Sequence, residues 1–347
     1  MRFFIDHDDG LSIRGWIVPD NQLAISRVIV SVEGRRVAEV AASLSDPTFK
    51  NNGWHATGQC IFVVTEVDVP GLAGLERLEL YDADTNVLVH RRVPTADLLQ
   101  RRMCLINTGI APETALQNVL FPHFERSYFG MHRMSDEILS SLFMNAAHSV
   151  LLSGAVVIPR YENFMTPDVM LTALLIQDPY IEMATRLQWL QARAGDAVDP
   201  THSWQLGPLA EAAAFMGDHD LVDAKSLKRI FRMLPEPAYR LLYNPLTRQL
   251  GTRMPEDRLH PGNSIAAIEV LSRVGIVGHK ARFGAFARSL FDQLELDVPL
   301  PDMPSPPDSV RDLAQQLRTI RAVDEMLVFD IAISDAVKDI VDKHWDA

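Results

Sequence analysis

The chain has 347 residues, of which 33 are Lys or Arg and 45 are Asp or Glu, so its formal net charge is −12. This acidic balance argues against a nucleic-acid-binding protein, because binding a polyanion needs cations clustered on one face. Apolar residues make up 47% and charged residues 22% of the sequence, which is typical of a folded globular protein and not of a disordered chain. At roughly 150 residues per domain, this length suggests two domains.

Cys60 and Cys104 are the two cysteines, too few for a disulfide framework or a structural zinc site. The histidines lack the spacing of metal ligands, so we expect no metal site. The longest apolar runs, residues 150–158 and 169–176, are much shorter than the roughly 20 residues of a membrane-spanning helix. The N-terminus turns acidic after three apolar residues, unlike a signal peptide. We therefore expect a soluble, cytoplasmic protein without a membrane span.

The first 95 residues contain short runs that are typical of strands. Residues 27–33 alternate apolar and polar side chains in part, and residues 77–82 alternate cleanly, as half-buried antiparallel strands do. Turn sequences such as Asp9-Gly10 and Pro70-Gly71 separate the runs. The predicted strands cover residues 3–5, 11–18, 27–33, 37–42, 59–69 and 77–93. Their spacing predicts a β-sandwich domain over residues 1–95.

After Thr95 the pattern changes to strands that alternate with helices. Residues 105–106, 150–158 and 169–176 are apolar without alternation, as expected for strands of a sheet that is covered on both faces. Helical periodicity occurs at residues 113–121, 135–145, 181–194, 209–215, 224–233, 263–274, 283–294, 310–322 and 324–341. The alternation predicts an α/β domain over residues 96–347 with a helical C-terminal half. Residues 298–308 are rich in proline and predict an extended surface strap.

Residues 105–120 have the pattern of a strand, a loop and a helix, a geometry that suits a bound phosphate. Glycine at Gly109 lets the backbone approach a ligand closely, and the hydroxyls of Thr108 and Thr114 add donors. No Lys or Arg occurs between Leu105 and Leu120. By itself the segment therefore fits an ordinary strand-to-helix turn better than a phosphate site.

Five further stretches follow in order: 149–155 with Ser153-Gly154, 170–186 with Asp178-Pro179, 243–250, 267–279 and 324–330. Together with the loop they resemble the motif series of carbohydrate sulfotransferases of the heparan-modifying type and their bacterial relatives. The similarity covers about residues 103–341. It implies a three-layer α/β fold of the P-loop type with a parallel sheet. It also implies 3′-phosphoadenosine 5′-phosphosulfate as the donor, whose sulfuryl group is transferred to a sugar hydroxyl.

The sequence departs from this family pattern at four charged or basic positions. The family's loop lysine falls on Asn107, and the histidine of its Ser-Gly-His motif falls on Ala155. Two arginines of its Arg-Asp-Pro motif fall on Gln177 and Glu182, while Thr185 stands at the serine. A carboxylate at about 4 Å from an anion in a partly buried site is repelled by about 4 kcal/mol. The scaffold is therefore similar, but the groups that would hold the donor are replaced.

Two functions from different classes stay open. The first is a sulfotransferase-like protein of bacterial surface-glycan metabolism with a degenerate donor site, either an active enzyme or a pseudoenzyme. The second is a non-catalytic module on the same scaffold that binds a glycan or a protein partner, with a homo-oligomer also open. If a donor binds, its contacts are expected among five residues: Thr108, Gly109, Thr114, Thr185 and Arg248. His123 is the candidate catalytic base, because a neutral imidazole accepts a proton from a hydroxyl.

The predicted β-domain has a resemblance of its own. Its Gly15-Trp16 opening and its Leu80-Tyr81-Asp82 ending resemble small immunoglobulin-like domains that precede bacterial glycan-modifying enzymes, which implies a docking or glycan-holding role. Trp16 and Trp54 offer apolar ring faces on which sugars could stack. Because Trp16 follows Gly15 inside a predicted strand, core packing is favoured for Trp16, and Trp54 stays open.

Overall fold

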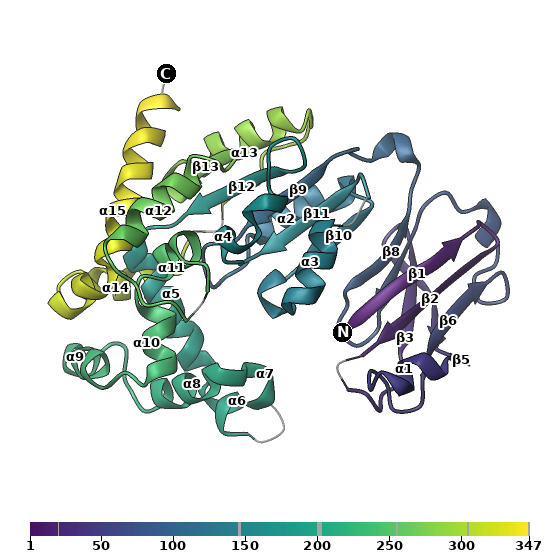
Figure 1. The fold of residues 1–347 in the computed structure, drawn as a ribbon, viewed down its shortest axis with the longest axis horizontal. Helices are drawn as coiled ribbons and strands as arrows, with labels where there is room; N and C mark the ends of the chain where they lie inside the picture. Colours follow the sequence, from purple (N-terminus) through teal and green to yellow (C-terminus); the bar gives the residue numbers. More distant parts are fainter. Residues whose placement is uncertain (20, 145–146, 200–202, 255, 304, 346–347) are drawn as a thin grey trace. The chain divides into compact units, whose positions relative to one another are not determined.

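The structure is a computed structural model that describes residues 1–19, 21–144, 147–199, 203–254, 256–303 and 305–345. Residues 145 and 304, which belong to a predicted helix and to the predicted strap, lie outside the described residues. The chain divides into two compact units (Figure 1). The first comprises Met1–Gln100, Phe121–Tyr128 and His148–Leu151, and the second comprises the remaining segments.

The first unit is built from two antiparallel sheets with the strand orders β1-β2-β6-β5 and β4-β3-β7-β8. Ile13, Ile17 and Phe62 from one sheet and Val28 and Leu80 from the other belong to one buried core. The predicted antiparallel sheets of the N-terminal part are thereby confirmed. The elements are β1 (Arg2–Asp8), β2 (Ser12–Val18), β3 (Arg27–Val32), β4 (Arg35–Ala41), β5 (Leu44–Ser45), α1 (Pro47–Asn51), β6 (Gln59–Thr65), η1 (Leu72–Gly74), β7 (Leu78–Asp82), β8 (Leu88–Arg92) and η2 (Thr95–Asp97).

A five-stranded sheet follows, with the order β10-β11-β9-β12-β13. Its strands are β9 (Arg102–Ile106), β10 (Arg126–Phe129), β11 (Val150–Gly154), β12 (Leu171–Ile176) and β13 (Ile276–His279). The strand β12 pairs in parallel with both β9 and β13. All residues of β12 are buried, as its unalternating apolar sequence predicts. The expected parallel sheet with helices in the later part of the chain is confirmed.

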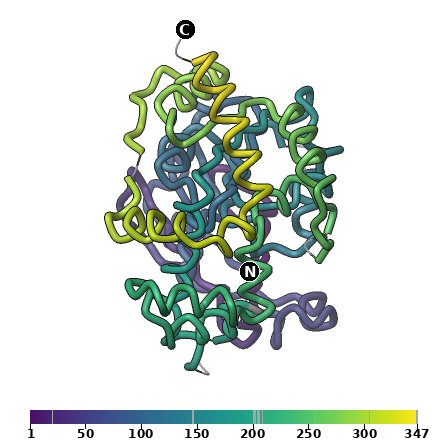
Figure 2. Tube along the Cα trace, turned by 90° about the vertical axis from the view of Figure 1, so that its left-hand side faces the viewer, coloured from purple at the N-terminus to yellow at the C-terminus, as the bar shows by residue number. Residues whose placement is uncertain are grey.

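Helices and short 3-10 turns make up most of the second unit. They are α2 (Thr114–Leu120), η3 (Phe121–His123, counted with the first unit), η4 (Met131–Arg133), α3 (Asp136–Met144), α4 (Ile158–Tyr161), η5 (Glu162–Phe164), α5 (Pro179–Ala192), α6 (Ala194–Val198), α7 (Ser203–Leu206), η6 (Gly207–Leu209), α8 (Ala210–Gly217), α9 (Ala224–Met233), α10 (Glu236–Leu242), α11 (Pro245–Gly251), α12 (Gly262–Leu271), η7 (Lys280–Arg282), α13 (Phe283–Gln293), α14 (Asp308–Leu317) and α15 (Arg321–His344). The long helix α15, yellow in Figures 1 and 2, lies beside α12. No helix within the described ranges is both long and apolar enough to cross a membrane.

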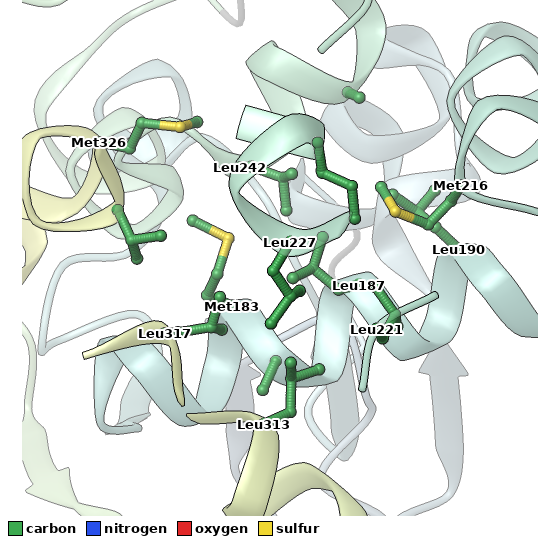
Figure 3. Packing of buried hydrophobic residues seen from close by; sticks show 14 of the residues in the cluster. Met183, Leu187, Leu190, Met216, Leu221, Leu227, Leu242, Leu313, Leu317 and Met326 are labelled. Atoms are coloured by element: carbon green, nitrogen blue, oxygen red, sulfur yellow. The ribbon is translucent and has the colours of Figure 1, made fainter. Parts of the chain in front are cut away.

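Helix α5 connects the sheet to a helical core. It begins where the Asp178 carboxylate accepts hydrogen bonds from the backbone N–H groups of Tyr180 and Ile181, which caps the helix N-terminus. Its apolar residues Met183, Leu187 and Leu190 pack against α8, α9, α10, α14 and α15 (Figure 3). This packing fixes the direction of α5 and thereby the positions of the polar residues on its first turns.

The predicted strand over residues 150–158 is wrong in its second half, because β11 ends at Gly154 and α4 begins at Ile158. Gly154 has a φ of 151° and lies so close to the next segment that a Cβ there would be 2.4 Å from the Met131 nitrogen. Only glycine fits this backbone conformation without strain. The strand therefore ends where the chain must turn past Met131.

Candidate functional site

The loops that follow β9 and β12 meet at the carboxyl edge of the sheet, because the two strands are parallel neighbours. Ligands of open α/β sheets bind at this edge. The Thr108 hydroxyl donates a hydrogen bond of 2.5 Å to the Leu175 carbonyl. This bond joins the loop after β9 to the carboxyl end of β12. Thr108 and Gly109 therefore lie beside the start of α5.

The Glu182 carboxylate of α5 contacts the backbone of the loop after β9. Its Oε1 accepts a hydrogen bond of 2.8 Å from the Ile110 N–H and one of 2.7 Å from Arg186 Nε. A Cβ at Gly109 would lie 2.8 Å from Oε2 of the same carboxylate. The side chains of Glu182 and Arg186 are only 13% and 10% exposed. A backbone N–H that could serve an external anion is thus bound to an anion of the chain itself.

Each nitrogen of the Arg186 guanidinium donates a hydrogen bond within this arrangement. Besides Glu182, its guanidinium donates to the Leu241 carbonyl at 3.0 Å and to the Thr108 carbonyl at 3.4 Å. The arginine thereby joins α5 to the loop and to the end of α10. Because its donors point at protein acceptors, it is a structural partner of Glu182 in this conformation.

Asn107 stands where the resembled family has its loop lysine. Its side-chain nitrogen donates to the carbonyls of Gly109, at 3.1 Å, and Ala111, at 2.9 Å. The backbone carbonyl of Asn107 accepts a hydrogen bond of 2.8 Å from the side-chain amide of Gln249 in α11. The amide therefore holds the loop in a closed turn and supplies no positive charge.

The side chain of Asp330 in α15 caps the N-terminus of α11. The Asp330 carboxylate accepts hydrogen bonds from the backbone N–H groups of Leu246, at 2.9 Å, and Thr247, at 2.7 Å, and from the Thr247 hydroxyl, at 2.6 Å. Burial raises the pKa of Asp330 to about 6, although these hydrogen bonds and the charge of Arg186 act in the opposite direction. The backbone N–H groups of Leu246 and Thr247 are therefore also hydrogen-bonded to a carboxylate of the protein itself.

The space left between these groups is small. A cavity of about 20 Å³ is lined by Thr108, Gln177, Glu182, Arg186 and Asp330, together with apolar residues of α5, α10, α11 and α15. That is room for about one water molecule, whereas sites for ligands of drug size measure roughly 300–1,000 Å³. This cavity is therefore too small to hold a nucleotide.

A second buried ion pair involves the residue that follows β13, the strand next to β12. Lys280, just after β13, lies 2.8 Å from the Glu113 carboxylate. Burial raises the pKa of Glu113, and the neighbouring Glu182 adds to this effect, while Lys280 opposes it. His279 at the end of β13 lies 3.2 Å from the Ser334 hydroxyl, and burial lowers its pKa. These polar groups also have partners within the chain.

Two of the other predicted donor contacts, Thr185 and Arg248, donate hydrogen bonds to carbonyl groups of the chain. Thr114 is the first residue of α2. The Thr185 hydroxyl donates to the Ile181 carbonyl of its own helix at 2.8 Å, and Arg248 donates to the Asp257 carbonyl at 2.8 Å. His123 belongs to the first unit, whereas Thr108 and Gly109 belong to the second. Burial and the charge of Arg91 lower the pKa of His123.

Three residues with a central place in the site were not singled out from the sequence: Arg186, Gln249 and Asp330. The spacing of Glu182 and Arg186, four residues apart in a helical pattern, is the one signal that could have indicated their ion pair. Gln249 and Asp330 contact partners that are 142 and 83 residues away, so no local pattern could have indicated them.

No protein-family model matches the chain, and no curated protein matches it. The likeness to carbohydrate sulfotransferases thus rests on the ordered motif residues.

Proposed function

We propose that this chain is a sulfotransferase-like protein of bacterial surface-glycan metabolism that no longer transfers sulfuryl groups and acts as a non-catalytic binding protein. The finer fold assignments belong to this proposal. They are a three-layer P-loop-type arrangement for the second unit and an immunoglobulin-like sandwich for the first. The meeting of the two loops at the carboxyl edges of β9 and β12 is the arrangement that the motif order would require.

The observation that carries the proposal is the contact between Glu182 and the Ile110 N–H. An incoming phosphate would have to break this hydrogen bond and also separate Glu182 from Arg186. If the carboxylate stayed nearby, two negative charges at about 4 Å would repel each other by about 4 kcal/mol at an effective dielectric constant near 20. The carboxylate therefore acts as an internal competitor for the anion position.

The residues at the loop do not fit the donor 3′-phosphoadenosine 5′-phosphosulfate. Transfer of such a group depends on positioning and on cations that stabilise the charge of the leaving phosphate. Asn107 is neutral and its donors are used within the loop. The side chain that follows β11, Ala155, cannot accept a proton. The positions of the motif cation and the motif base are therefore held by Asn107 and Ala155, which can serve neither role.

The proposal is tested by titrating the full chain with 3′-phosphoadenosine 5′-phosphate and following both the heat of binding and the unfolding temperature. A ligand that binds the native state raises its stability by mass action. We expect no heat and no shift at millimolar nucleotide. In parallel, the chain is incubated with labelled donor and a mixture of glycan acceptors. Binding at micromolar nucleotide together with a sulfated product would overturn the proposal.

A further inference from the structure

The outer face of the sheet β1-β2-β6-β5 in the first unit carries exposed aromatic residues. Phe4 of β1 and Trp16 of β2 are directly opposite each other across the two strands. Neighbouring residues of a strand point to opposite faces, and Ile17 next to Trp16 belongs to the core between the sheets. Trp16 therefore points outward, where it packs against a smaller cluster with Phe49 and Trp54. This differs from the predicted packing of Trp16 in the domain core.

Three rings form this aromatic face, which we define as Phe4, Trp16 and Trp54. The ring centres of Phe4 and Trp16 are 6.4 Å apart with an angle of 29° between the planes, and those of Trp16 and Trp54 are 6.4 Å apart with an angle of 36°. Phe4 is 53% exposed, and the two tryptophans are partly exposed. Buried Phe49, whose ring centre is 5.1 Å from that of Trp16, supports the rings from one side.

Polar groups surround the aromatic face. The guanidinium carbon of Arg2 lies 4.6 Å from the ring centre of Trp54. Arg14 and Asp6, which share this face of the sheet, form an ion pair of 3.5 Å with side chains that are 43% and 35% exposed. Among the described residues, no protein atom accepts a hydrogen bond from the indole N–H of Trp16 or Trp54. Donors and a carboxylate are thus available beside the rings.

We propose that the aromatic face binds a glycan made of pyranose sugars. The apolar C–H face of a sugar ring stacks on an aromatic ring, and its hydroxyls need hydrogen-bonding groups at the ring edges, which this face provides in the indole N–H groups, Arg2 and Asp6. A protein partner is disfavoured, because stable protein interfaces bury about 800 Å² on each side around a desolvated centre. Three rings with charged neighbours are too small an area for that.

This inference extends the proposed function, since it assigns the binding role to residues of the first unit. It does not depend on Glu182 or on the loop after β9. Either proposal can therefore fail while the other stands. The variant Glu182→Gln is expected to bind the glycan as the unaltered chain does, provided that it folds.

The test uses the full chain and three soluble hexasaccharides, made of glucose, of mannose and of N-acetylglucosamine. Binding is measured by calorimetry and by the change in tryptophan fluorescence, because two of the five tryptophans lie on the aromatic face. We expect saturable binding of at least one hexasaccharide. We also expect Phe4→Ser and Arg2→Gln each to weaken it by about tenfold, with Phe4→Tyr restoring the affinity.

Val37→Ser is the matched control, since Val37 is also exposed, at 50%, and lies on β4 in the other sheet of the first unit. It should leave the affinity unchanged, and the unfolding temperature of each variant shows whether it folds. The proposal is overturned if none of the three hexasaccharides binds, or if binding survives Phe4→Ser in full. It is also overturned if the chain dimerises in sedimentation and Phe4→Ser abolishes the dimer, because a second copy then covers the face.

Discussion

Asn244 and Asp330 each accept hydrogen bonds from the backbone of the other's segment. The Asn244 side-chain oxygen accepts from the N–H groups of Phe329, at 2.9 Å, and Asp330, at 3.2 Å. Asp330 in turn caps the first turn of α11, which begins directly after Asn244. Asn244 has a φ of 43°, a left-handed conformation that asparagine tolerates better than most residues. This reciprocal contact fixes α11, and with it Gln249, against the loop after β9.

The buried Asp330 carboxylate should make the stability of the second unit decrease as pH rises. Its pKa is about 6 in the folded chain and 3.8 in its ordinary state. A carboxyl group whose pKa is raised by folding stabilises the native state fully below the ordinary pKa, and this contribution is lost as pH rises through the folded value. The shift corresponds to about 3 kcal/mol.

Asp330→Asn tests this expectation, because an amide of the same shape does not titrate. Urea unfolding of both proteins is compared from below pH 3.8 to above about pH 6. The stability of the unaltered chain relative to the variant should fall by about 3 kcal/mol across this range. A difference that stays constant with pH would show that Asp330 is not buried as a carboxyl group of raised pKa.

Asp8 in the first unit should have the opposite pH dependence. Burial raises its pKa, but hydrogen bonds from His90, at 2.8 Å, and from Arg92 outweigh burial, so its pKa lies well below the usual value. Its stabilising contribution is present above the ordinary pKa of 3.8 and is lost as pH falls through the lower folded value. Asp8→Asn should lower the free energy of unfolding at neutral pH by about 2 kcal/mol and remove part of the acid sensitivity. Asp84→Asn, which alters an exposed ion pair with Arg27, is the control. It should change the free energy of unfolding by no more than about 0.5 kcal/mol at neutral and at acidic pH.

Two glutamate–arginine pairs with the same helical spacing allow a matched comparison. Glu182 and Arg186 are buried, whereas Glu236 and Arg240 are 68% and 53% exposed. Removing one partner of a buried pair leaves an uncompensated charge, so Glu182→Gln should cost about 3 kcal/mol. Glu236→Gln should cost no more than about 0.5 kcal/mol. Urea unfolding measures both, and equal losses would mean that the loop does not depend on the Glu182 charge.

Gly109→Ala tests how closely Glu182 approaches the loop. The added methyl group would lie 2.8 Å from the Glu182 carboxylate and should displace it from the Ile110 N–H, at a cost of about 1–2 kcal/mol. Combined with Glu182→Ala the substitution should cost about 1 kcal/mol less than it does alone. The control is Gly284→Ala in α13, where a Cβ meets nothing within 4 Å and alanine favours the helix. Additive effects of Gly109→Ala and Glu182→Ala would argue against the contact.

The sequence could predict elements whose signal is local. The unalternating apolar run at residues 169–176 predicted β12, and the helical period over residues 224–233 coincides with α9. The helices α10 and α11 were not predicted, because each has only seven residues, too few to show a clear helical period. Such short helices are held by their partners, as the cap from Asp330 shows, and not by their own sequence.

The sequence placed the loop after β9 and the segment Asp178-Pro179 in one candidate site, but it did not predict that Glu182 would contact this loop. Because β9 and β12 are neighbouring strands, Thr108 and Gly109 lie near the start of α5. The loop motif and Asp178-Pro179 together suggested this proximity. That Glu182 would satisfy the Ile110 N–H depends on a contact across 72 residues. The sequence showed only that a carboxylate stands where an arginine was expected. Charge at a position can be read from sequence, whereas the partner that compensates it comes from the tertiary structure.

The most direct test of the account is the binding of inorganic sulfate to the unaltered chain and to Glu182→Ala, measured by calorimetry at equal ionic strength. If Glu182 holds the anion position at the loop, the unaltered chain should give no heat at millimolar sulfate. The variant should bind, because the Ile110 N–H and Arg186 become available to the ion. Sulfate binding that is equal in the two proteins, or absent from both although the variant is folded, would contradict the account.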